Sequence, residues 1–177
     1  MIENILEDFS IAYNLKYISL RYFNAAGADL DLEIGEKHNP ETHLIPLLLD
    51  AASGKSEKFK IFGSDYKTKD GTCIRDFIHV NDLAQAHLLS LESLLDNGKS
   101  DIFNLGVGVG FSILDAINAV EEITSSQILT EIHDRRSGDP AILIASSDKI
   151  IRKLKWEPEY TDLISIIKSA YNWHKTL

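Results

Sequence analysis

Arg75 and Asp76 are two charged residues that stand among the apolar neighbours Ile74, Phe77 and Ile78. An unpaired charge is costly to bury, so each of the two side chains requires a partner or a ligand. One interpretation is a salt bridge between the two residues, or a position at the edge of a sheet. The other is an anion site, because the guanidinium fork of arginine matches a phosphate group. The segment alone leaves both interpretations open.

Three glycines, Gly106, Gly108 and Gly110, follow a strand pattern and precede a helix pattern. Their spacing does not fit the dinucleotide-binding sequence G-x-G-x-x-G, because the third glycine would fall on Phe111. The run is therefore interpreted as a glycine-rich turn between a strand and a helix.

Tyr171 and Lys175 have the Tyr-x-x-x-Lys spacing that can place a proton-transferring phenol beside a lysine on a helix. With six tyrosines in 177 residues, chance accounts well for one such pair. The pair also falls on the predicted core face of its helix. We therefore expect no catalytic residue among these two.

The six histidines show no metal-ligand spacing, and Cys73 is the only cysteine. A zinc site is therefore not expected, and the sequence predicts no metal. His38 and His43 share the approach to a helix, where solvated or capping roles are the better interpretation.

The composition excludes several classes of partner. The net charge of −9 argues against non-specific binding to nucleic acid or to an acidic membrane surface. The most apolar stretch, 44–52, is interrupted by Pro46 and Asp50 and is too short to span a bilayer. No secretory signal is recognisable, and a single cysteine is typical of a reducing compartment, so we expect a cytoplasmic protein.

Strand and helix patterns alternate along the chain. Apolar runs predict strands at 17–23, 59–62, 73–80, 101–105 and 128–133, with a short apolar run at 142–145. Helical spacing predicts helices at 1–14, 42–53, 81–97, 112–123 and 162–175, and a small helix closed by Trp156. Expected N-caps are Thr42, the pair Asn81 and Asp82, and a Ser112–Asp115 capping box. This alternation indicates an α/β fold with a mainly parallel sheet and a smaller subregion.

Several runs of sequence carry a family resemblance. They are FKIFGSDYKTKDGTCIRDFIHVNDLA (59–84), RYFNAAG (21–27), ETHLIP (41–46), FNLGVGVGFSILD (103–115) and RRSGDPA (135–141). Together they resemble the UDP-glucose 4-epimerases of the extended short-chain dehydrogenase/reductase family, over the whole chain. The resemblance implies the C-terminal part of a Rossmann-like doubly wound parallel sheet, near 1–27 and 81–125. It also implies a smaller α/β subdomain for nucleotide sugars, near 28–80 and 126–177.

The resemblance also implies roles for single residues. Phe23 would lie against the nicotinamide of NAD, and Asn24 would bond the sugar nucleotide. His43 and Leu44 would contact the diphosphate. The uracil would be held by Lys60, Ile61 and Phe62 through backbone groups and ring packing.

Arg75 and Arg136 would clamp the two phosphates, although RRSGD by itself could be an exposed charged turn. Asp139 would accept a hydrogen bond from a ribose or sugar hydroxyl. Leu143 would line the hexose pocket, where its bulk would disfavour a C2 acetamide group, although residues 142–145 could instead form a core strand.

The glycine-rich NAD loop and the catalytic Tyr-x-x-x-Lys of such enzymes do not occur in these 177 residues. Residues 1–3 resemble those just after the catalytic lysine, so the chain is expected to be the C-terminal half of an epimerase and inactive alone. Its expected partners are UDP-glucose and UDP-galactose, a separate N-terminal half, and a second copy in a homodimer. A non-catalytic binding fragment, or part of another nucleotide-sugar dehydratase or decarboxylase, remains the alternative.

Overall fold

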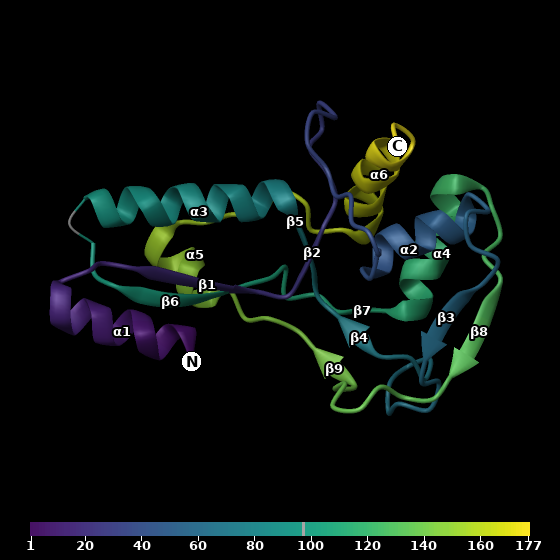
Figure 1. Cartoon of the computed structure of the whole chain (residues 1–177), viewed down its shortest axis with the longest axis horizontal. Helices are drawn as coiled ribbons and strands as arrows, with labels where there is room; N and C mark the ends of the chain where they lie inside the picture. The colour runs from purple at the N-terminus through teal and green to yellow at the C-terminus, as the bar shows by residue number, and fades with distance from the viewer. Residues whose placement is uncertain (97) are drawn as a thin grey trace.

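Two hydrophobic clusters organise the chain, whose computed structural model describes residues 1–96 and 98–177. The elements around them lie toward opposite ends of the longest axis (Figure 1). Asn97, at which the sequence predicts the end of a helix, lies outside the described residues.

The first cluster, here the strand-pair cluster, forms around β1 (Ile18–Tyr22) and β6 (Asp101–Leu105). These strands are parallel, in a register that pairs Ile18 with Asp101 and Tyr22 with Leu105. The helices α3 (Val80–Leu95) and α5 (Asp148–Leu154) pack against them. The fully buried Trp156 completes this cluster, and its indole N–H donates to the backbone oxygen of Asp82 over 3.0 Å.

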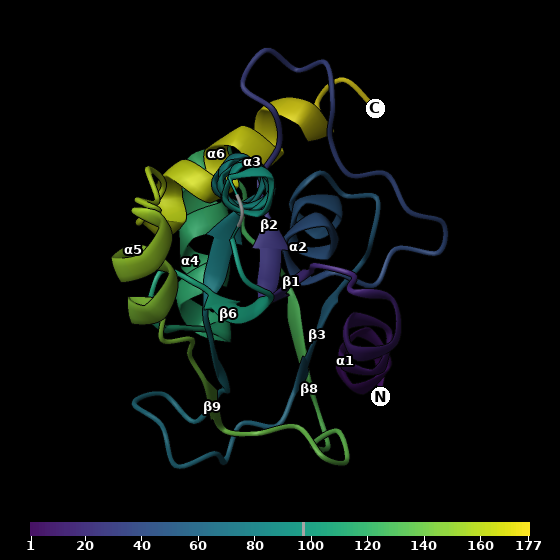
Figure 2. The same ribbon diagram turned by 90° about the vertical axis from the view of Figure 1, so that its left-hand side faces the viewer.

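The second cluster, here the helical cluster, lies between α2 (Leu44–Ala52), α4 (Ile113–Thr124) and α6 (Leu163–His174). The parallel strands β3 (Phe59–Phe62) and β8 (Thr130–His133) adjoin it (Figure 2). Apolar residues at helical spacing form the buried faces, as the sequence predicts; they include Ile117, Val120, Leu163, Ile167 and Ala170. This grouping differs from the expected division, because α4 packs with the helices of the 28–80 and 126–177 part, whereas α5 packs beside β6.

Short strands connect the two ends. The strands β2 (Asn24–Ala26) and β5 (Phe77–His79) pair in parallel. Between them and the helical cluster, β4 (Ile74–Arg75) pairs antiparallel with β7 (Phe111–Ser112) and parallel with β9 (Ile142–Leu143). Apart from β4 with β7, all strand pairs among the described residues are parallel, which confirms the α/β class with mainly parallel strands.

The segment 73–80 is not one strand, as the sequence predicts, but is broken at Asp76. The Asp76 carboxylate accepts backbone N–H groups from Val107 (2.9 Å), Gly108 (3.0 Å) and Ala145 (3.1 Å). At this residue the strand changes partners, because β4 pairs with β7 and β9 whereas β5 pairs with β2. The salt bridge between Arg75 and Asp76 is not formed, because Arg75 pairs with Asp139 instead.

Two of the three predicted N-caps are wrong by one to three residues. His79, rather than Asn81 or Asp82, caps α3, and its Nδ1 accepts the N–H of Asn81. His43, rather than Thr42, occupies the N-cap of α2, and its side chain makes no capping hydrogen bond. The Ser112–Asp115 capping box is confirmed.

Helix α1 (Ile2–Tyr13) forms at the predicted helical spacing but buries none of its residues. Ile2, Ile5 and Phe9 are 71%, 47% and 49% exposed, so its apolar side is open to solvent. An ion pair between Glu3 and Arg21 holds the helix beside β1. Within the described residues, no helix has the length and apolar character needed to cross a membrane.

Candidate functional site

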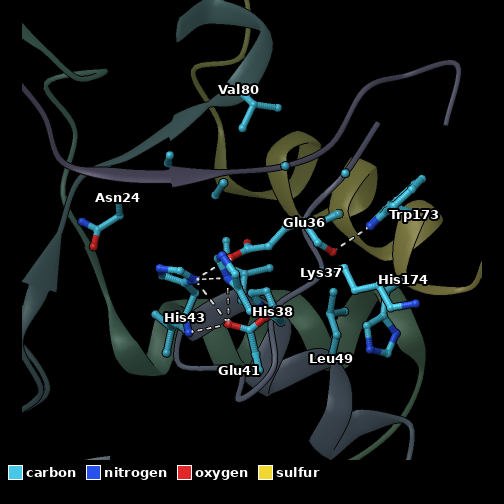
Figure 3. Close-up of a pocket in the computed structure, with 18 of the residues that line it drawn as sticks. Asn24, Glu36, Lys37, His38, Glu41, His43, Leu49, Val80, Trp173 and His174 are labelled. Carbon is cyan, nitrogen blue, oxygen red and sulfur yellow. Dashed lines mark hydrogen bonds and ion pairs between the residues drawn. The ribbon is translucent and has the colours of Figure 1, made fainter. Parts of the chain in front are cut away.

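A groove of about 1100 Å³ opens where β2, the loop before α2, the start of α3 and the end of α6 meet (Figure 3). Four of the residues proposed from sequence line it: Phe23, Asn24, His43 and Leu44. Phe23 and Asn24 follow the carboxyl end of the parallel strand β1, where ligands gather in open α/β sheets. The fold therefore brings the two predicted strand-end residues and the start of α2 to one cavity.

Asn24 is held in place from its amide nitrogen. Its side-chain NH₂ donates to the backbone oxygen of Asp76 over 2.8 Å, and its backbone N–H donates to the same oxygen over 3.2 Å. Because the NH₂ group is fixed in this way, the side-chain oxygen is the group that can accept a hydrogen bond from a ligand hydroxyl.

Arg75 lies outside this groove, in a second site on β4. Only 8% of the residue is exposed, and its guanidinium pairs with Asp139 and donates to the Ile74 oxygen over 2.7 Å. Because the Asp139 carboxylate is itself 25% exposed, this ion pair lies close to solvent at one end. A guanidinium fixed by one carboxylate still has N–H donors for a second anion.

Arg136 lies in the same region as Arg75, with its guanidinium carbon 4.0 Å from the centre of the Phe62 ring. Both arginines lie near enough to Cys73 to influence its pKa. Burial raises the pKa of the Cys73 thiol, and the positive charges of Arg75 and Arg136 oppose that rise. The two cations thus converge on one part of the molecule, although they are 61 positions apart in sequence (136 − 75). We refer to Phe62, Arg75, Arg136 and Asp139 as the arginine site.

The strand β3 supplies Lys60, Ile61 and Phe62, the residues expected to hold the uracil. Among the described residues it pairs with β8 alone, so its other edge presents backbone N–H and C=O groups. Ile61 is buried in the helical cluster, which leaves only its backbone for a ligand, while Lys60 is exposed.

Leu143, opposite Arg75 in the β4–β9 register, is 39% exposed. The core-strand interpretation of 142–145 is wrong for Ile142, Leu143 and Ile144, because each is at least 39% exposed.

The glycine run forms the predicted turn between strand and helix. Gly106 follows β6, and a Cβ atom at this position would lie 2.5 Å from the Asp76 carboxylate. Gly108 has a φ of +78° and donates its N–H to that carboxylate. The run serves the packing of Asp76 rather than a dinucleotide.

The pair Tyr171 and Lys175 does not reach the groove. The Tyr171 ring packs against the helical cluster, and the Lys175 ammonium lies 4.6 Å from the centre of that ring. Neither residue is part of the groove lining.

Similarity to known proteins agrees with this arrangement. A family model described as the NAD dependent epimerase/dehydratase family matches residues 1–106. The chain belongs to that family.

Among curated relatives of this epimerase/dehydratase chain, a UDP-glucose 4-epimerase of Halalkalibacterium halodurans is 55% identical over 93% of the chain and 49% of the relative. A crystal structure of a UDP-glucose 4-epimerase superposes with a TM-score of 0.95 at 52% identity, covering 99% of this chain and 53% of that one. The Brucella ovis UDP-glucose 4-epimerase, crystallised with NAD, gives a TM-score of 0.92 at 46% identity, with 96% and 52% covered. The chain thus spans about half the length of the curated relatives it matches.

The sequence does not predict that residues at two helix ends also line the groove. Val80 and Asn81 at the start of α3 and Trp173 and His174 at the end of α6 also line it. Hydrophobic periodicity assigns such residues to helices, and it carries no information on which helix ends meet. The one sequence feature that could have indicated part of this lining is the adjacent pair Trp173 and His174 in the last turn of a helix.

Proposed function

We propose that the chain is the UDP-sugar-binding C-terminal part of a UDP-glucose 4-epimerase, which interconverts UDP-galactose and UDP-glucose by transient oxidation at C4. The observation that carries this proposal is the arginine site, in which Arg136 lies over the Phe62 ring at the end of β3 and Arg75 pairs with Asp139. An aromatic ring beneath one guanidinium, next to a second guanidinium, suits a nucleotide base followed by two phosphates. The identity to relatives of that name supports the same assignment.

Each residue of the arginine site has a binding role in this proposal. Phe62 and the backbone of Lys60 and Ile61 hold the uracil. Arg75 and Arg136 hold the diphosphate by charge-assisted hydrogen bonds. Asp139 orients Arg75 and accepts a hydrogen bond from a ribose or sugar hydroxyl.

The groove would hold the sugar and the nicotinamide part of NAD. Phe23 and Val80 give it an apolar wall, which fits the face of a nicotinamide ring, and Asn24 presents an amide oxygen to a sugar hydroxyl. NAD, when bound, supplies hydride acceptance and return. Phe23 and Asn24 position the two reactants and limit the access of water.

We further propose that an N-terminal part of the protein covers α1 and supplies the glycine loop and the Tyr-x-x-x-Lys pair. The exposed apolar residues Ile2, Ile5 and Phe9 support this, because they form one side of a helix that buries nothing within the described residues. The complete enzyme is then expected to form a homodimer.

The experiment that tests this function combines the chain with the N-terminal half of the Halalkalibacterium halodurans relative. The assembly should convert UDP-galactose to UDP-glucose, and the isolated chain should neither convert it nor retain NAD. Turnover by the isolated chain that Tyr171→Phe abolishes would contradict the proposal. A dehydrated or decarboxylated product would assign the chain to another sugar-nucleotide enzyme, and UDP binding by an inactive assembly would make it a binding module.

A further inference from the structure

Four side chains of the loop before α2 converge on one point at the wall of the groove (Figure 3). They are Glu36, His38, Glu41 and His43, which offer two imidazole nitrogens and two carboxylate oxygens within 4.8 Å of one another. We refer to them as the loop cluster.

The ligand atoms of the loop cluster lie at distances near those between the ligands of one metal ion, with Glu41 Oε1 and His38 Nδ1 3.8 Å apart. The two Nδ1 atoms of His38 and His43 are 3.1 Å apart. Glu36 Oε1 lies 2.9 Å from His38 Nδ1 and in closer contact with His43 Nδ1, and Glu41 Oε1 lies 3.3 Å from His43 Nδ1. Zinc binds histidine nitrogen at about 2.0–2.1 Å, so neighbouring ligands of a tetrahedron are about 3.3 Å apart.

Hydrogen bonds within the loop and contacts with α6 hold the backbone of this loop. The backbone N–H groups of Thr42 and His43 donate to Glu41 Oε1 over 2.7 and 2.8 Å, at the start of α2. The Trp173 indole N–H on α6 donates to the backbone oxygen of Glu36 over 2.8 Å. Gly35 packs against the same indole so closely that a Cβ atom would lie 2.2 Å from it. The ligands are thus presented by an anchored backbone rather than by a free loop.

We propose that the loop cluster is a site for a divalent transition-metal cation of the Zn²⁺ or Co²⁺ class. Two carboxylates balance the charge of the cation, and imidazole with carboxylate suits these metals. Mg²⁺ and Ca²⁺ prefer oxygen ligands throughout and are excluded by the two imidazoles. The bound cation cross-links residues 36–43, which end at the start of α2. This inference does not depend on the sugar nucleotide.

The sequence predicts no metal, because Glu-x-His-x-x-Glu-x-His is not a familiar ligand spacing. The four residues become neighbours only through the path of the loop. Both histidines are exposed, as expected, and His43 occupies the N-cap of α2; their contact with each other comes in addition.

The test is a titration of the tag-free chain with Co²⁺ and with Zn²⁺. We expect one equivalent of Co²⁺ to give the visible absorption of a tetrahedral complex, and one equivalent of Zn²⁺ to displace it and raise the Tm. His38→Ala and Glu36→Gln should each weaken binding by roughly tenfold or more, since even outer-shell changes cost that much. His87→Ala, an exposed histidine on α3, is the matched control and should bind normally.

The proposal would be overturned if the chain showed no saturable binding of Co²⁺ and Zn²⁺. It would also be overturned if His38→Ala and Glu36→Gln bound these metals as tightly as the unchanged chain, or if His87→Ala lost as much affinity as those two variants. A rise in Tm with Mg²⁺ equal to that with Zn²⁺ would also contradict it, because the site would then respond to charge alone. Circular dichroism of both loop-cluster variants separates loss of a ligand from loss of the fold.

Discussion

Asp76 is a buried carboxylate whose role is structural. It is fully buried, and its two oxygens accept three backbone N–H groups from the β6–β7 turn and from Ala145. The same residue sets the position of Asn24 through its backbone oxygen. Removal of this charge should therefore loosen both the turn and the groove.

Asp76→Asn should lower the free energy of unfolding by about 2–3 kcal/mol, because hydrogen bonds to a charged acceptor are the strong ones and an amide NH₂ would face backbone N–H groups. Urea denaturation measures this. Asp134→Asn, in an exposed loop, is the control and should change stability by less than about 0.5 kcal/mol. Equal stability of the two variants would show that the hydrogen bonds of the Asp76 carboxylate do not contribute to the free energy of unfolding.

Leu143 is not part of the groove lining and lies opposite Arg75, so the expectation that it contacts the hexose needs its own test. If it lies against the sugar, a C2 acetamide should be disfavoured by roughly 1 to 3 kcal/mol, the cost of extra atoms in a packed site. In the assembly with an N-terminal half, kcat/KM should be higher for UDP-galactose than for UDP-N-acetylgalactosamine, and Leu143→Cys should narrow the gap. Near-equal values in the unchanged assembly would remove Leu143 from the specificity of the site.

At the scale of elements, His79 joins β5, α3 and α6. Its Nδ1 accepts the Asn81 N–H, so its Nε2 carries the proton and donates to Ser169 Oγ over 2.9 Å. Ser169 in turn donates to the Ile166 oxygen and accepts the N–H of Ala28. Burial lowers the pKa of His79, while the charge of Asp82 opposes this effect.

This lowered pKa predicts a pH dependence of stability. Above the ordinary pKa of histidine, about 6.5, both the folded and the unfolded chain hold His79 neutral. As the pH falls below that value, the unfolded chain binds a proton that the folded chain resists, so stability decreases. The Tm should therefore drop between pH 7.5 and 5.5, and His79→Gln should reduce that drop. His87→Gln should leave it unchanged, and a drop of the same size in His79→Gln would contradict the assignment.

Local signals in the sequence predict the elements well where the contacts are local. The Ser112–Asp115 capping box is confirmed because both partners lie within one turn, and the apolar faces of α4 and α6 are confirmed because helical spacing alone reveals them. The segment 73–80 is mispredicted because Asp76 is bound by residues about 30 and 70 positions away. The loop cluster is not predicted for another reason: its residues lie between 36 and 43, but the path of the loop brings their side chains together.

At the scale of the whole molecule, the two hydrophobic clusters differ in how their surroundings cover them. The helical cluster is closed by three helices, whereas the strand-pair cluster is flanked by α1, whose apolar side is exposed. A surface of this kind is typical of an interface with another part of the protein.

Phe9→Glu tests that interpretation. Phe9 is 49% exposed, so the change should alter the stability of the isolated chain by less than about 0.5 kcal/mol. It should nevertheless prevent assembly with the N-terminal half, as size-exclusion chromatography of the mixture measures. Tyr13→Glu on the same helix, 74% exposed, extends the test, and normal assembly of both variants would show that α1 is not the interface.

The central claim, that this chain carries a site for UDP, is tested most directly by calorimetric titration of the chain with UDP. We expect saturable binding that Arg136→Ala and Arg75→Ala each weaken by about 1.5–3 kcal/mol, the contribution of a hydrogen bond to a charged group. Arg135→Ala is the matched control, because this neighbouring arginine is paired with Asp65 over 2.6 Å and lies over the Tyr66 ring, and it should bind UDP normally. Unchanged UDP affinity in Arg75→Ala and Arg136→Ala, with only their thermal stability reduced, would contradict the account and make both arginines part of the fold alone.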